Sequence, residues 1–229
     1  MMLHRFYAFA TAALLVLLAA PTHVRACPFC NAVSQTLRQE MQAMDAVVIA
    51  TAIQGDKDRD KETGQVAMKV KLVLKGDEFC SVGQTVDAVY YGEVKAGRTF
   101  LLSGVDPPKL QWSCLPLSKR AEKYVVDITE LEDDDVERLR FFHRYLEDEE
   151  TMLARDAYDE FASAPYAAIK GLKSDMDHDQ LIKWIRSTEL GADRKRLYLT
   201  MLGICGSKKD LPLLKEIMQS TQKLSLIHI

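Results

Sequence analysis

The sequence predicts a mixed α+β protein in two parts, a small β-barrel or sandwich followed by paired helices. Between residues 46 and 128 apolar and polar residues alternate, which is typical of strands that bury one face. Beyond residue 130 apolar residues recur every three or four positions, which is typical of amphipathic helices. An apolar run at the N-terminus forms a separate segment before both parts.

Residues 1–26 read as a secretory signal peptide. Arg5 contributes to a short positive start, and the apolar run Phe6–Ala20 follows it. This run of about 15 residues is shorter than the roughly 20 residues that cross a bilayer. We therefore expect cleavage after Ala26 and a secreted or periplasmic protein that begins at Cys27. A lipid anchor on Cys27 is the alternative, although Arg25 stands where the attachment motif favours a small residue.

The composition is that of a globular, weakly acidic protein. Hydrophobic residues make up 48% of the chain and charged residues 28%, with a formal net charge of -3. No strongly basic patch stands out, which argues against nucleic-acid binding. We expect no nucleic-acid partner and no membrane contact beyond the signal peptide.

The first part, residues 27–130, is expected to contain one short helix and several short strands. The helix covers about Ala32–Ala43. Strict alternation marks the clearest strand, and Lys75-Gly76-Asp77 closes it as a turn. The expected strands are Ala46–Ala50, Val66–Leu74, Thr85–Tyr91, Arg98–Ser103, Leu110–Leu115 and Tyr124–Ile128.

The second part, residues 131–222, is expected to be helical. Acidic residues at 133–135 favour a helix start, and Pro165, Gly191 and Gly206 separate the segments that follow. Short breaks between such segments indicate antiparallel helix pairs. The apolar stripes are Val136/Leu139/Phe142/Leu146, Leu153/Ala157/Tyr158/Phe161, Leu197/Met201/Leu202/Cys205 and Leu211/Leu214/Met218. Residues 223–229 lack an amphipathic pattern and read as a non-native tail, so we expect the natural chain to continue.

Cysteine is the residue type with the clearest chemical pattern. Four cysteines lie in the first part, at Cys27, Cys30, Cys80 and Cys114, and export favours disulfides among them. Four cysteines allow three pairings, and the sequence does not choose among them. Our preferred interpretation is structural, with Cys27 and Cys30 stapling the N-terminus through the other two. The alternative is thiol–disulfide exchange at the C-x-x-C motif Cys27–Cys30. We expect no catalytic residue outside that alternative, no metal and no cofactor.

The first part resembles the netrin-like module of tissue inhibitors of metalloproteinases. The matching pieces occur in the family's order and are Cys27–Cys30, Met44–Ala50, Leu72–Gly76, Gly97–Gly104 and Cys114. The resemblance implies an OB-type barrel with disulfides. It also implies that the mature N-terminal Cys27 could chelate a protease's zinc through its amino group and carbonyl oxygen. The family opens with C-x-C, where this chain has C-x-x-C.

The second part resembles HEAT-type helical repeats. Arg196–Gly203 and Asp210–Leu214 match the two helices of one repeat. The resemblance implies a binding or spacing surface without chemistry of its own. We therefore expect an exported, non-catalytic interaction or scaffold protein with an unknown protein partner. The alternatives are a thiol–disulfide oxidoreductase and a metalloprotease inhibitor.

Overall fold

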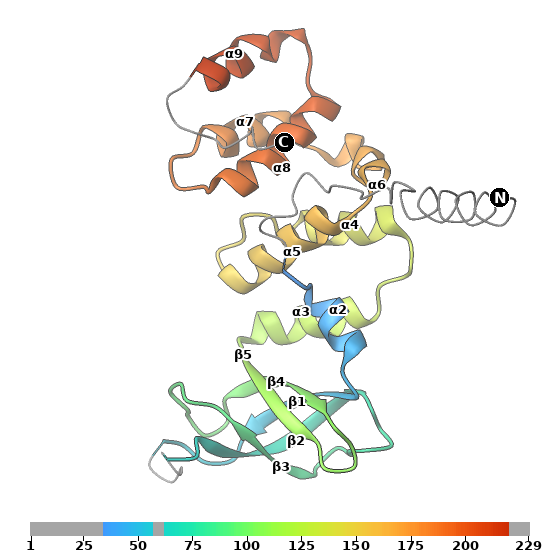
Figure 1. Ribbon diagram of the computed structural model, residues 1–229, viewed down its shortest axis with the longest axis vertical. Coiled ribbons are helices and arrows are strands. Elements are labelled where there is room, and N and C mark those ends of the chain that lie inside the picture. Colours follow the sequence, from blue (N-terminus) through green and yellow to red (C-terminus); the bar gives the residue numbers. More distant parts are fainter. Residues whose placement is uncertain (1–33, 57–61, 220–229) are drawn as a thin grey trace, which may run out of the picture.

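The computed structural model of the chain describes residues 34–56 and 62–219. This part has a mixed α+β fold, in which a curled five-stranded antiparallel sheet lies at one end and eight α-helices stack beyond it (Figure 1). The predicted α+β class is therefore confirmed. The predicted signal peptide, residues 1–26, and the predicted tail, residues 223–229, lie outside the described residues.

The sheet has the strand order β3-β2-β1-β4-β5, and every neighbouring pair is antiparallel. The two edge strands, β3 and β5, also contact each other, so the sheet is curled. The strands are β1 (Ala46–Ala52), β2 (Gln65–Lys75), β3 (Thr85–Val89), β4 (Thr99–Val105) and β5 (Gln111–Leu117). Five of the six expected strands are thus confirmed.

The sheet buries apolar residues on both faces. Ala46, Val48 and Ala50 of β1 point into a cluster enclosed by the curl, whereas Val47 and Ile49 face the helices. A central strand covered on both sides needs an almost continuous apolar run, and β1 has one. The helix-facing cluster is therefore continuous with the sheet.

The helices are of ordinary globular length. They are α2 (Leu37–Ala43), α3 (Lys119–Thr129), α4 (Asp135–His143), α5 (Thr151–Ser163), α6 (Tyr166–Gly171), α7 (His178–Arg186), α8 (Ala192–Cys205) and α9 (Leu211–Gln219). As predicted from the acids at 133–135, Asp134 caps α4, where its side chain accepts hydrogen bonds from the backbone of Val136 and Glu137. Within the described residues no helix combines the length and the apolar character that crossing a membrane requires.

The expected strand Tyr124–Ile128 is wrong, because these residues belong to α3. Ser118 caps this helix by accepting a hydrogen bond from the backbone of Ala121. The buried positions Ala121, Tyr124, Val125 and Ile128 follow the spacing of one helix face, and this face lies in the core. The β-branched and aromatic content of the segment favours a strand locally, but packing of that face decides for a helix.

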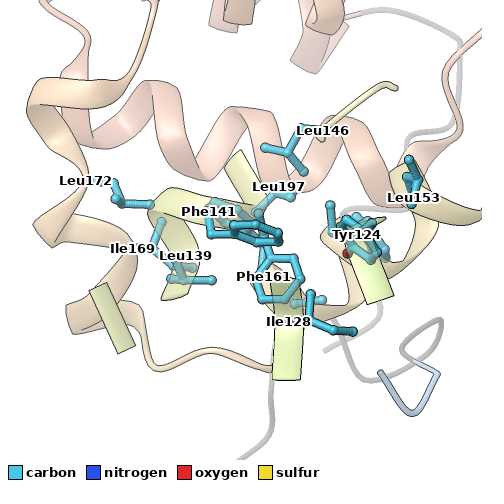
Figure 2. Close-up of a cluster of buried hydrophobic side chains, with 14 of the residues drawn as sticks. Tyr124, Ile128, Leu139, Phe141, Leu146, Leu153, Phe161, Ile169, Leu172 and Leu197 are labelled. Carbon is cyan, nitrogen blue, oxygen red and sulfur yellow. The ribbon is translucent and has the colours of Figure 1, made fainter. Parts of the chain in front are cut away.

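One core joins α2 and α3 to the helices beyond them. Figure 2 shows Tyr124 and Ile128 of α3 in one cluster with Leu139 of α4, Phe161 of α5 and Leu197 of α8. All five are at most 1% exposed, and each such burial contributes roughly 1.5–3 kcal/mol to folding. The expected boundary between the two parts, at residue 130, therefore falls directly after α3. Residues before and after this boundary share one hydrophobic core.

Candidate binding pocket

A pocket of about 260 Å³ lies where α2, the end of α3 and the paired ends of β1 and β2 meet. We refer to it as the α2 pocket. Five of its nine lining residues are apolar and four are polar, and the polar groups come from α2, the end of β2 and the end of α3. The lining residues are Arg38, Met41, Gln42, Val47, Leu74, Lys75, Ile128, Thr129 and Leu131.

Helix α2 supplies one wall because its start is fixed by a capping box. The Thr36 side chain accepts from the backbone of Gln39, and the Gln39 side chain accepts from the backbone of Thr36. Arg38, Met41 and Gln42 then follow at intervals of three and one, which places them on neighbouring positions of one helix face. This face borders the pocket.

The start of α2 is also tied to α5 by two buried carboxylates. The backbone N–H of Leu37 donates to Oδ1 of Asp156 at 2.7 Å, and that of Ser34 donates to Oδ1 of Asp159 at 3.2 Å. The Tyr124 hydroxyl of α3 donates to the other oxygen of Asp156 at 2.6 Å. Asp156 therefore connects α2, α3 and α5, and it sets the distance between two walls of the pocket.

Burial is the main influence on the ionisation of Asp156. It raises the pKa of this carboxyl from 3.8 to about 6, although the hydrogen bonds from Tyr124 and Leu37 act in the opposite direction. The pKa of the Tyr124 hydroxyl is raised as well, first by burial and then by the charge of Asp156. The tyrosine therefore stays protonated and remains the donor.

The opposite wall is formed by the first residues of β1 and the last residues of β2. Val47 pairs with Lys75 across these strands. Gly76 follows with a φ of +82°, and a Cβ there would lie 2.6 Å from the carbonyl oxygen of Asp45. Only glycine suits this turn, and the turn places Lys75 at the pocket. The Lys75 ammonium donates to the carbonyl oxygen of Gln42 near the end of α2, at 2.6 Å.

Arg38 is backed by a buried group of charges. Its Nε lies 3.7 Å from Oε1 of Glu160, which is only 3% exposed. The other oxygen of Glu160 accepts from Nε of Arg138 at 3.2 Å, and Arg138 also pairs with Asp135 at 2.6 Å. The group thus holds two arginines and two carboxylates, and Glu160 lies beside both arginines.

The pocket therefore combines apolar walls with an excess of positive charge. Arg38 and Lys75 line it, and no carboxylate does. Within the described part of the chain, Arg38 donates no hydrogen bond, and its Nε is buried without an acceptor. Such a site can attract a negative group and at the same time shelter carbon from water.

The structure places two of the four cysteines that the sequence singled out. Cys80 is buried in the cluster inside the curl, and the Cys114 thiol donates to the carbonyl oxygen of Val89 at 3.0 Å. Neither forms a disulfide within the described residues. Burial raises the pKa of Cys114 to about 11, and it also raises that of Cys80, so both thiols are protonated near neutral pH.

Cys27 and Cys30 lie outside the described residues, and the disulfide staple therefore stays a prediction. So do thiol exchange by this pair and zinc chelation by an N-terminal Cys27. Mass mapping of the disulfides in the mature protein distinguishes the staple from the exchange site. Bridges from Cys27 and Cys30 to distant cysteines would leave no exchange-competent pair.

Groups of three or more His, Cys, Asp or Glu placed to hold a metal are absent among the residues that the structure describes. His178 does pair with Asp210 at 2.9 Å, which joins the start of α7 to the turn before α9. This is a structural contact between helices, which the sequence pattern did not indicate.

Comparison with known proteins does not add a family assignment. No protein-family model matches the chain, and no curated protein matches it. The α2 pocket itself was missed by the sequence analysis, because Arg38, Lys75 and Leu131 are far apart in the chain. The turn Lys75-Gly76 was the one part of it that the sequence marked.

Proposed function

We propose that this chain is an exported, non-catalytic binding protein that recognises a protein partner through the α2 pocket. The observation that carries the proposal is the pocket itself, with apolar walls from three elements and two cations facing no lining carboxylate. Apolar pockets with a few placed polar groups are the usual form of a recognition site. The pocket supplies charge, hydrogen-bonding groups and apolar side chains, which are the means of binding.

The arrangement of the elements supports this proposal. A five-stranded antiparallel sheet with touching edge strands is compatible with a partly open barrel of the OB type. The contacting pairs α4–α5 and α7–α8 are compatible with stacked helical repeats of the HEAT type. Both architectures commonly present binding surfaces, and in this chain the pocket lies where the sheet meets the first helices.

Site-specific cross-linking tests the proposal directly. A photoreactive phenylalanine analogue replaces Thr129, which is exposed and lines the pocket. The matched control carries the same analogue at Lys95, on the exposed loop before β4. The purified mature chain is irradiated in a cell-envelope extract, and its adducts are identified by mass spectrometry.

A discrete protein adduct that forms at position 129 and not at position 95 is the expected result. An excess of unlabelled mature chain should reduce its yield, because both compete for the same partner. If position 129 gives no adduct, or if both positions give the same set, the proposed function is wrong.

A further inference from the structure

We propose that the α2 pocket receives the C-terminal residue of a polypeptide, an apolar side chain together with its free carboxylate. This inference rests on the proposed binding function and names the chemistry of its ligand. It combines three properties of the pocket, namely its size, its charge and the polar groups beside its cations.

The size of the pocket suits one residue. Its volume is about 260 Å³. Pockets that hold drug-sized ligands measure roughly 300–1,000 Å³, so this smaller pocket suits a ligand of the size of a single amino-acid residue such as leucine. Leu74 and Leu131 are half-buried and offer such a side chain an apolar surface. The buried Met41, Val47 and Ile128 form a rigid base behind them.

The charge of the pocket calls for one anionic group. Arg38 and Lys75 stand on different walls, and the only carboxylate that the structure places beside either of them is Glu160, which Arg138 also contacts. An arginine binds a carboxylate with two parallel hydrogen bonds, and charge assistance makes these stronger than neutral ones. The buried Nε of Arg38 faces Glu160 at 3.7 Å, so a free carboxylate in the pocket would pair with the outer nitrogens of the guanidinium.

The remaining polar groups favour a peptide over a free acid. Gln42 on α2 and Thr129 at the end of α3 line the pocket and are exposed. The Thr129 hydroxyl already donates to the carbonyl oxygen of Val126 but can still accept from a peptide N–H, and the Gln42 amide can both donate and accept. A short fatty acid has no peptide N–H, so it leaves these groups to water.

Three ligands separate the possibilities in titrations of the mature protein followed by calorimetry or NMR. They are N-acetyl-Gly-Gly-Leu with a free carboxylate, the same peptide as its C-terminal amide, and 4-methylpentanoate. We expect the free peptide to bind at least about tenfold more tightly than its amide, because the amide loses the charge-assisted contacts. It should also bind more tightly than 4-methylpentanoate.

Two pairs of variants test the residues. Leu131 is half-buried, so Leu131→Glu and Leu131→Lys remove the same apolar contact and differ in the charge that they place at the pocket. We expect the glutamate variant to bind the free peptide at least about tenfold more weakly than the lysine variant. Lys75→Met keeps the aliphatic stem and should weaken binding several-fold, whereas Lys95→Met, a distant control, should leave it unchanged.

Equal affinity for the free peptide and its amide would overturn the inference. So would equal affinity for 4-methylpentanoate, since the ligand would then be a free acid. If no peptide binds while the cross-link at position 129 still forms, the named ligand is wrong and the binding function stands. If peptide binding and the cross-link both fail, both proposals are wrong.

Discussion

Replacing Asp156 by asparagine should change how the stability of this protein depends on pH. The carboxylate is 5% exposed and accepts hydrogen bonds from the Leu37 backbone and the Tyr124 hydroxyl. An asparagine can still accept from Leu37, and its amide can donate to the tyrosine oxygen. The substitution therefore removes the ionisation and keeps the geometry that positions α2 against α3.

The size of the effect follows from the raised pKa. A carboxyl that binds its proton more tightly in the folded state contributes stability below its ordinary pKa of 3.8, and this contribution is lost as the pH rises through about 6. Integrating this linkage from pH 5 to pH 7.5 gives a loss on the order of 1 kcal/mol in the native protein. The asparagine variant lacks this loss.

Urea unfolding at pH 5 and pH 7.5 measures the effect. We expect the free energy of unfolding of Asp156→Asn, relative to the unsubstituted protein, to rise by about 1 kcal/mol between the two pH values. Asp133→Asn, at an exposed position on the loop before α4, is the control. If Asp156→Asn shows no more pH dependence than this control, the carboxylate does not titrate as its burial requires.

Two further predictions concern the turn at the pocket and the contact between the last helices. Gly76→Ala should lower the free energy of unfolding by at least about 1 kcal/mol more than Gly83→Ala. Both glycines have a positive φ, but of the two only a Cβ at Gly76 would meet backbone atoms within 4 Å. Equal losses in urea unfolding would show that this close approach to the backbone is unimportant. His178→Gln should destabilise the protein more at pH 5.5 than at pH 8.5. The hydrogen bonds of His178 to carboxylates raise its pKa, and the stability that they contribute is lost as the pH rises above that pKa. An equal loss of stability at both pH values would contradict this prediction.

The sheet could be predicted from the sequence because its strands carry local patterns. Val66, Met68 and Val70 alternate with outward residues, and glycines mark the turns around them. Helix α3 could not be assigned in this way, because Tyr124, Val125 and Ile128 favour a strand until the face that they share is packed against other helices. The spacing of apolar residues predicts the correct element only where the propensities of the same residues favour that element too.

The candidate pocket could not be predicted, because its residues come together only through tertiary structure. Arg38 lies on a short helix whose place depends on Asp156, more than a hundred residues later. The sequence does not distinguish Lys75 from the other lysines, and only its pairing with Val47 across the strands places it at the pocket. Conversely, the motif that the sequence marked most clearly, Cys27–Cys30, lies outside the described residues.

Methyl NMR of the mature protein with N-acetyl-Gly-Gly-Leu is the most direct measurement of where a ligand binds. We predict that the methyl signals of Met41, Val47 and Leu131 shift in proportion to the bound fraction, because these side chains line the pocket. Signals of Val66 and Val86, inside the curl of the sheet, should stay in place. Shifts that leave out the pocket methyls and follow another surface would contradict the assignment of the α2 pocket as the binding site.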